Sequence, residues 1–400
     1  MGVGTKQAVV TSGLEARPST FGALDPSALR CEAAPHGHAL PIAGRRQSGK
    51  PNCGQSKVWA IVVGYRNAED IVGCLRALAF TCTPPLFDVI IVENGGAQAF
   101  NALCDALMEV GSPCLPVANS TPAHLAHVGV ERQSFKLLRG NQARETGVHT
   151  LQMLDNLGYA GAINACIRPL LSAGEWHAIW ILNPDTEPLP SALFELADYA
   201  ATHSKGMVGS LVTTGLTAAA SSNCGLKWNK FSARTTAVGP HAREERATAG
   251  GGAPMVDAAS GASLYVTRHL IERIGLMDEQ YFLYFEDLEW GCRANALNEL
   301  GVARQSIVIH KGGTTIGSAE TRSARSNLSV YLEFRNRILF VRQQYKGWLV
   351  WTALVQTVYL AAFLPSGALS NLLSAGKGLI AGLRGQTGRP DRLLKAHVKR

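Results

Sequence analysis

Short hydrophobic runs alternate with stretches of helical periodicity along most of the chain. Residues 58–63 and 89–92 are apolar runs rich in β-branched side chains, which predicts two buried strands. Between them, apolar residues recur at the spacing of one helix face, at Ile71, Val72, Leu75, Leu78 and Ala79. This strand–helix–strand order is typical of a doubly wound, mostly parallel sheet flanked by helices.

The same alternation continues to residue 345 and predicts one α/β domain over residues 58–345. Further strands are expected at residues 148–154, 178–182, 207–213, 260–267 and 302–310. Further helices are expected at residues 100–110, 191–201, 268–275, 288–300 and 326–345. Residues 97–147 are poorly patterned beyond their first helix, and residues 214–252 resemble a loop.

Composition narrows the class of protein. Apolar residues make up 46% of the chain and charged residues 17%, which excludes a disordered protein. The nine cysteines show no C-x-x-C pair, so we expect buried or free thiols in a reducing compartment. Residues 1–57 are rich in Gly, Pro, Ser and Ala and are expected to form a flexible extension. Their start lacks the pattern of a signal peptide, which favours a cytoplasmic location.

Candidate chemistry gathers where predicted strands end. Asn183-Pro184-Asp185 directly follows the strand at residues 178–182, and ligands of open α/β sheets bind beyond the carboxyl ends of strands. Asp185 is therefore a candidate ligand for a hard divalent cation, or else it caps its own turn. His310 ends another strand and is a candidate metal or phosphate ligand, with a purely structural role as the alternative.

A second cluster of carboxylates lies at a predicted helix start, at Glu286, Asp287 and Glu289. These charges can simply complement the helix dipole. The aromatic run before them suggests more, because a partly desolvated wall raises a carboxyl pKa toward that of a general base. Adjacent helix residues point to different faces, so we expect only one of Glu286 and Asp287 to face a substrate.

The ordered motifs resemble those of family 2 glycosyltransferases, particularly the rhamnosyltransferase-like branch. The resemblance covers residues 58–345. It is carried by Val62-Val-Gly-Tyr-Arg-Asn67, Val92-Glu-Asn-Gly95, Asn156-Leu-Gly-Tyr-Ala-Gly161, Leu182-Asn-Pro-Asp185, Gly261-Ala, Phe282-Leu-Tyr-Phe-Glu-Asp287, Arg293, His310 and Tyr331-x3-Arg335-Asn-Arg337.

The resemblance implies a fold of the glycosyltransferase A type that binds a dTDP- or UDP-sugar. Tyr65, Asn67 and Glu93 would face the base and ribose. The remaining donor-side positions would be Asn94, Asn156, Gly158, Ala160, Asn164 and Asn183. Glu93 stands where many relatives have Asp, and Asn183 stands where a two-aspartate metal motif has its first carboxylate.

The resemblance also implies an inverting single displacement. Asp185, assisted by His310, would hold Mg²⁺ or Mn²⁺ on the diphosphate, and Asp287 would deprotonate the acceptor hydroxyl. The remaining motif residues, Glu286, Arg293 and Arg335, would lie toward the acceptor or support it.

Residues 346–400 predict hydrophobic and basic helices that follow the main domain. Residues 348–364 carry no charge, but at seventeen residues they are short for a membrane span. Flanking Trp, Lys and Arg favour a helix lying on a membrane surface, ahead of a hairpin packed on the protein or a second subunit. A true span is the least favoured alternative.

Together these features predict a hexosyltransferase at the inner face of the cell membrane, peripheral to it. It would move rhamnose or another hexose to a glycan or lipid-linked acceptor in surface-polysaccharide biosynthesis. We expect no nucleic-acid partner, and homo-oligomer formation stays open. The alternative function is an inactive nucleotide-binding scaffold of the same fold.

Overall fold

The computed structural model describes residues 57–82, 84–118, 120–139, 145–217, 220–240, 256–312, 325–364, 367–391 and 393–394. They belong to one compact unit, Ser48–Arg400. The extension predicted for residues 1–57 lies outside the described residues, except for Lys57 at the start of the first strand.

The centre of the main sheet is parallel, as predicted. Four neighbouring strands run parallel in the order β5 (Thr146–Gln152), β2 (Leu86–Glu93), β1 (Lys57–Gly64) and β6 (Ala178–Leu182). Next to them, β12 (Ser263–Thr267) is antiparallel to both β6 and β8 (Met207–Thr213), whereas β13 (Leu300–His310) is parallel to β8. Short antiparallel strands complete the sheet: β3 (Cys114–Pro116), β4 (Glu131–Leu137), β7 (Thr186–Pro188) and β9 (Ser222–Asn223).

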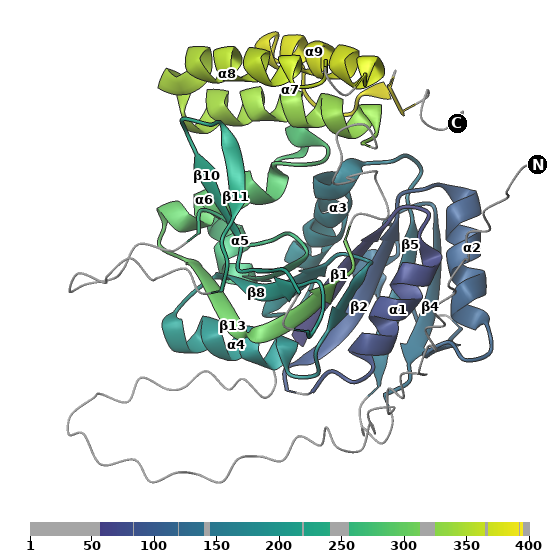
Figure 1. The fold of residues 1–400 in the computed structure, drawn as a ribbon. Coiled ribbons are helices and arrows are strands. Elements are labelled where there is room, and N and C mark those ends of the chain that lie inside the picture. The colour runs from purple at the N-terminus through teal and green to yellow at the C-terminus, as the bar shows by residue number, and fades with distance from the viewer. Residues whose placement is uncertain are drawn as a thin grey trace, which may run out of the picture. The chain divides into compact units, whose positions relative to one another are not determined.

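Helices cover both faces of this sheet (Figure 1). One core contains Val58, Ala60 and Val62 of β1 together with side chains of α1 (Ala68–Leu78), α2 (Ala97–Met108) and α4 (Ala192–His203). The other contains Trp59, Ile61 and Val63 together with α3 (Gly158–Ser172), α5 (Arg268–Ile274) and α6 (Glu286–Ala296). Alternate residues of β1 thus enter opposite cores, and the predicted α/β fold class is confirmed.

Two poorly patterned segments hold more strand than the sequence indicates. Within residues 97–147, β3 and β4 extend the sheet beyond β5. Within residues 214–252, the prediction of a loop is wrong for one part, because β10 (Leu226–Asn229) and β11 (Arg234–Ala237) form a hairpin there. All four residues of β11 are exposed, so no apolar alternation marks it in the sequence.

The C-terminal part of the chain forms three packed helices, α7 (Asn327–Gln344), α8 (Leu349–Ala361) and α9 (Leu369–Leu383). Gly378 and Gly382 of α9 face the backbone of α7, where an added Cβ would lie 2.3 Å from the Tyr331 carbonyl oxygen and 2.7 Å from that of Arg335. The β10–β11 hairpin reaches this layer, since Trp351 Nε1 donates to the carbonyl oxygen of Phe231 (Figure 1). No helix among the described residues combines the length and hydrophobicity needed to cross a membrane.

Candidate functional site

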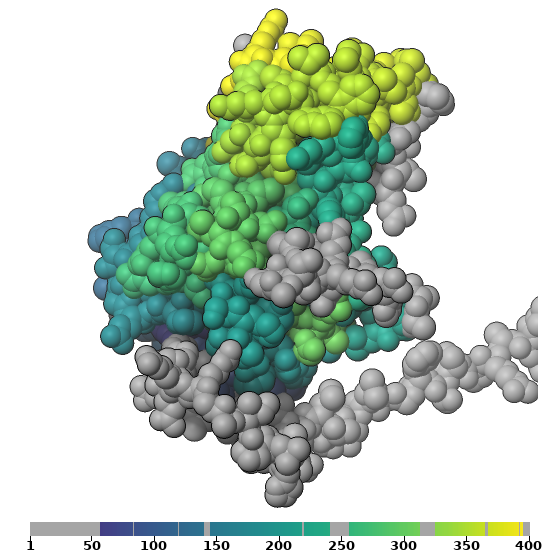
Figure 2. Space-filling view, turned by 90° about the vertical axis from the view of Figure 1, so that its left-hand side faces the viewer, coloured from purple at the N-terminus to yellow at the C-terminus, as the bar shows by residue number. Residues whose placement is uncertain are grey.

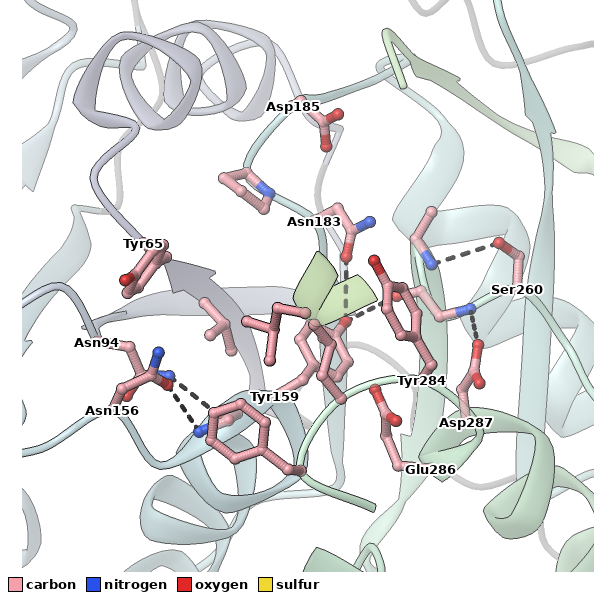
Figure 3. A pocket seen from close by; sticks show the side chains of 18 of the residues that line it. Tyr65, Asn94, Asn156, Tyr159, Asn183, Asp185, Ser260, Tyr284, Glu286 and Asp287 are labelled. Carbon is pink, nitrogen blue, oxygen red and sulfur yellow. Dashed lines mark hydrogen bonds between the residues drawn. The ribbon is translucent and has the colours of Figure 1, made fainter. Parts of the chain in front are cut away.

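A pocket of about 320 Å³ opens beyond the carboxyl ends of the central strands (Figure 3). Figure 3 shows Asn183 and Asp185 on one side of it, Glu286 and Asp287 on another, and Tyr159 between them. The remaining walls come from Val63, Tyr65, Asn94, Asn156, Gly158, Pro184, Ser260, Gly261, Ala262, Phe282, Leu283, Tyr284, His310, Leu328 and Leu394. The structure therefore brings together most of the site residues predicted from the sequence.

Strand pairing explains why Asp185 and His310 meet. His310 at the end of β13 pairs with Thr186 at the start of β7, one residue after Asp185. His310 Nε2 lies 3.1 Å from Asp185 Oδ1 and 3.3 Å from Asn183 Nδ2. Burial alone raises the Asp185 pKa, but the hydrogen bond and charge of His310 outweigh it and lower the pKa below its usual value. Asp185 is thus held as a carboxylate at the pocket wall.

The asparagines on the donor side shape the backbone beside the pocket. Asn94 Nδ2 donates to the Gly158 carbonyl oxygen at 3.0 Å, and Asn156 Oδ1 accepts from Gly158 N at 2.9 Å. Gly158 has φ of +73°, and an added Cβ would lie 2.1 Å from the Phe282 carbonyl oxygen. Glycine is required there because both the dihedral and the close approach exclude a side chain.

Tyr159 lines the pocket but is not among the site residues predicted from the sequence. Its hydroxyl donates to the Gly261 carbonyl oxygen at 2.9 Å and lies 3.2 Å from Asn183 Oδ1. Its backbone N–H donates to the Phe282 carbonyl oxygen at 2.8 Å. Tyr159 lies inside the motif at residues 156–161. Its aromatic ring at the start of a predicted helix is the feature of the sequence that could have marked it as a pocket residue.

Four residues predicted on the donor side do not line the pocket. Asn67 Oδ1 accepts from Tyr65 N, and Glu93 Oε1 accepts from the N–H groups of Arg66 and Gly95, so both shape the neighbouring loops. Ala160 is a core residue. The Asn164 amide donates to the Met277 carbonyl oxygen and accepts from the Met277 N–H, so it holds that backbone in place. In this structure the four side chains therefore serve the neighbouring backbone or the core, and a short polar side chain in a motif can do so as readily as it binds a ligand.

The backbone before α6 is strained. Phe282, Tyr284 and Phe285 have φ of +66°, +67° and +79°, in the left-handed region that bulky residues rarely adopt. Asn336 of α7 holds this segment, with Nδ2 donating to the carbonyl oxygens of Tyr281, Leu283 and Tyr284 at 3.0, 2.8 and 2.8 Å. Because this strained segment is held in place, Glu286 and Asp287, which follow it, have a defined position.

Glu286 and Asp287 both line the pocket, so the expectation that only one of them could face it is wrong. α6 begins at Glu286, not at Leu288, and its N-cap Phe285 is left-handed. Adjacent residues of a helix lie only about 100° apart around its axis, so the first two can both border one pocket. Asp287 Oδ1 accepts from Leu288 N at 2.8 Å and Oδ2 from Gly261 N at 3.3 Å. Glu286 Oε2 is buried without a hydrogen-bond partner among the described residues.

Burial raises the pKa of both carboxyl groups. For Asp287 the two backbone hydrogen bonds oppose the rise. For Glu286 burial acts together with the neighbouring Asp287 charge and raises the pKa to about 8. Because the Asp287 charge is one of the causes that raise the Glu286 pKa, Asp287 ionises first and Glu286 stays protonated below about pH 8.

Arg293 and Arg335, expected near the acceptor, do not line the pocket. Arg293 bonds Glu289 and the carbonyl oxygens of Ile274 and Leu276. Arg335 is 1% exposed, and its Nη2 donates to the Tyr281 carbonyl oxygen at 2.8 Å. Both arginines bond carbonyl groups of the segment at residues 274–281, which leads into the pocket residues that start at Phe282.

The donor set around Asp185 fits a divalent cation only in part. The described residues contain no group of three or more His, Cys, Asp or Glu side chains that could hold a metal ion. Asp185 Oδ1 and His310 Nε2 can supply two neighbouring donors. A cation there would take its other ligands from water and from a bound phosphate, as Mg²⁺ commonly does.

One curated protein is similar in sequence to part of the chain. It is the low-salt glycan biosynthesis hexosyltransferase Agl10 of Haloferax volcanii, 26% identical over 145 residues. The match covers 34% of this chain and 46% of that protein, less than half of its length. No protein-family model matches the chain. The hexosyltransferase relative agrees with the enzyme class predicted from the motifs.

Solved glycosyltransferase structures also align with the chain, each at 12% identity. The mannosyltransferase PcManGT of Pyrobaculum calidifontis, with GDP-Man and Mn²⁺, aligns at a TM-score of 0.41 over 82% of this chain and 86% of its own. S. aureus TarS 1-349, with UDP-GlcNAc, aligns at a TM-score of 0.43 over 82% of this chain and 92% of its own. GalNAc-T7, with UDP, GalNAc and Mn²⁺, aligns at a TM-score of 0.45 over 71% of this chain and 51% of its own.

Proposed function

We propose that this chain is a nucleotide-sugar-dependent glycosyltransferase related to family 2 and its rhamnosyltransferase-like branch. One observation carries the proposal: a single pocket at the strand ends brings Asp185 with His310 on one side and Asp287 with Glu286 on another. Such an arrangement provides a site for a leaving group and a base for an attacking hydroxyl. The curated hexosyltransferase relative supports this class of reaction.

The donor, a dTDP- or UDP-sugar carrying rhamnose or another hexose, would lie along the strand ends. Tyr65 offers an aromatic ring, and Asn94 with Asn156 fixes the backbone beside the sugar nucleotide. Asp185 and His310 would hold Mg²⁺ or Mn²⁺. When bound, the cation offsets the negative charge of the leaving diphosphate.

The transfer step would use Asp287 as the general base. The acceptor hydroxyl gives its proton to the Asp287 carboxylate while its oxygen forms a bond to the anomeric carbon. The bond from that carbon to the diphosphate oxygen breaks, and its electron pair leaves with the diphosphate. A single displacement of this kind inverts the anomeric centre. The bonds from Gly261 and Leu288 aim the carboxylate.

We also propose that the enzyme works against the inner face of the cell membrane, on a glycan or lipid-linked acceptor of surface polysaccharide. On α8, Val350, Leu354 and Val358 are 75, 58 and 69% exposed and share one face of the helix. Residues 346–390 contain four Lys or Arg and no Asp or Glu. One of these four, Arg389, pairs with Asp155 and Asp391. The excess of basic over acidic residues in this segment, together with its exposed apolar side chains, suits an anionic lipid surface. Figure 2 shows these helices, yellow-green, at one end of the molecule.

A screen of nucleotide-sugars by thermal unfolding tests the function. With Mn²⁺ present, one class of nucleotide-sugar should raise the melting temperature, because a ligand that binds only the folded state stabilises it. A chelator should abolish the shift. Slow Mn²⁺-dependent hydrolysis of the stabilising donor distinguishes an enzyme from the alternative, a nucleotide-binding scaffold. No shift with any nucleotide-sugar would contradict the proposal.

A further inference from the structure

The turn of the β10–β11 hairpin carries an exposed aromatic side chain beside α8 (Figure 1). Phe231 is 71% exposed, and its carbonyl oxygen accepts from Trp351 Nε1 at 2.8 Å. We propose that this turn and the outer face of α8 form one surface that docks on an anionic membrane, with the Phe231 ring entering the lipid. The inference rests on the membrane association proposed above for α8 and extends it to the main domain.

The exposed apolar side chains of the turn and of α8 adjoin one another. The Phe231 ring packs edge-on against Trp348, with ring centroids 5.0 Å apart, and Trp351 is 46% exposed. Trp351 follows Val350, the first of the exposed apolar residues of α8. A single exposed apolar side chain needs no explanation, whereas an extended contiguous patch marks an interaction site.

Polar contacts hold the turn against α8. The Tyr359 hydroxyl donates to the Ser232 carbonyl oxygen at 2.6 Å, and the Arg234 guanidinium lies 3.8 Å from the centroid of the Tyr359 ring. Within the turn, Ser232 N donates to Asn229 Oδ1 at 2.9 Å. None of these contacts involves the Phe231 ring, so the turn does not need an aromatic side chain at this position in order to form.

The charges around these side chains favour an anionic surface. Residues 226–237 and 346–361 contain no Asp or Glu. Their four basic residues are all exposed: Lys227, Lys230, Arg234 and Lys346. Basic side chains beside exposed Trp, Phe and aliphatic ones are typical of proteins that bind anionic lipid. A second copy of this chain suits the surface less well, because a two-fold contact would bring the same positive charges together.

The hairpin also reaches the proposed base. Trp228 of β10 packs edge-on against Phe285, with ring centroids 6.1 Å apart, and Phe285 lies two residues before Asp287. Leu226 and Thr235 line a second pocket, of about 340 Å³, whose wall includes Asp287. One short hairpin thus joins the surface proposed for lipid to the carboxylate proposed as base, which suits an acceptor that is itself carried by the membrane.

Sedimentation of the full chain with vesicles of phosphatidylglycerol and phosphatidylcholine tests the inference. Phe231→Ser should weaken binding by at least about tenfold, the effect of losing one aromatic side chain from the lipid, and Phe231→Trp should bind like the parent. Phe80→Ser is the matched control, because Phe80 is 66% exposed just after α1, and it should also bind like the parent. Lys230→Gln should weaken binding about fivefold, and only on vesicles that contain the anionic lipid.

The outcomes separate this inference from the other proposals. If Phe231→Ser sediments like the parent while Leu354→Ser with Val358→Ser does not, α8 docks alone and the inference is wrong. A parent that never sediments with these vesicles overturns the docking of both elements. If light scattering shows a parent dimer that Phe231→Ser dissociates, the surface binds a second copy, which also overturns the inference. UDP or dTDP binding in Mn²⁺ should be equal in Phe231→Ser and the parent, and its absence from both would refute the transfer function separately.

Discussion

The side-chain amide of Asn336 lies 2.8 Å from the carbonyl oxygen of Tyr284, only three residues before Asp287. The same amide bonds two more carbonyl groups of this strained segment, those of Tyr281 and Leu283. Asn336 is fully buried and does not line the pocket. A helix remote from the central sheet thus determines where the proposed base lies.

Replacing Asn336 by Leu should loosen this segment. The carbonyl groups of Leu283 and Tyr284 would lose their side-chain donor, whereas that of Tyr281 would keep Arg335 Nη2 and Leu283 N. An unsatisfied buried polar group costs about 1–3 kcal/mol. We expect the free energy of unfolding, from urea titration, to fall by about 2 kcal/mol or more. Transfer activity at a temperature where the variant stays folded should fall further than donor affinity. Asn101→Leu, at an exposed site on α2, is the matched control and should change neither.

Asp287→Asn should remove transfer while leaving donor binding nearly intact. The loss of a general base costs about 10²–10⁴-fold in rate. The donor would be held by other residues, so its dissociation constant should change only a few-fold. Single-turnover transfer and a separate binding titration measure the two effects. An Asp287→Asn enzyme that transfers sugar at the parent rate would refute the assignment, as would this same phenotype in Glu286→Gln.

The dependence of transfer activity on pH should reflect the titration of both Asp287 and Glu286. Asp287 must be ionised to accept a proton, and burial raises its pKa, so activity should be lost as the pH falls through a value above the ordinary aspartate range. Glu286 ionises near pH 8 and then adds negative charge beside Asp287, Tyr159 and Tyr284. Activity should therefore also decline above about pH 8.

The variant Glu286→Gln isolates the alkaline decline. Gln cannot ionise but keeps the shape and polarity of the protonated carboxyl group. The variant should retain the acidic limb of the kcat/KM profile and lose the alkaline one. If the alkaline limb stays where it is in the parent, Glu286 is not its source.

Much of the fold follows from local patterns in the sequence. The strand predicted at residues 207–213 agrees with β8 (Met207–Thr213), because its apolar residues are buried and so leave a pattern. The hairpin of β10 and β11 was not predicted, because β11 is exposed and leaves no apolar pattern in the sequence. Its position depends on distant partners such as Trp351, which no local pattern reveals.

The candidate site was predictable in its residue types but not in their roles. Asp185 lies three residues after the apolar strand β6 and His310 ends β13, and the pairing of β13 with β7 brings them together. Asn164 and Arg335 look equally functional in the sequence, yet they bond buried carbonyl groups. Only the packed structure separates a polar side chain that serves the backbone from one that faces a pocket.

The exposed face of α8 should bind anionic membranes. The double variant Leu354→Ser and Val358→Ser should sediment less with vesicles containing phosphatidylglycerol, because it removes apolar contact area while leaving the buried side of the helix unchanged. Leu115→Ser with Val117→Ser, also exposed but at the sheet edge, is the control. Equal sedimentation of parent and α8 variant, or a dimer that the α8 variant disrupts, would show that this face binds something else.

Metal-dependent nucleotide binding through Asp185 tests the central claim most directly. Calorimetric titration should compare the parent, Asp185→Asn and the control Asp105→Asn with UDP or dTDP, in Mn²⁺ and in chelator. We predict that Mn²⁺ tightens nucleotide binding to the parent and the control by at least about tenfold, and that Asp185→Asn abolishes this gain without losing its fold. Equal affinities for parent and Asp185→Asn, with and without Mn²⁺, would contradict the account.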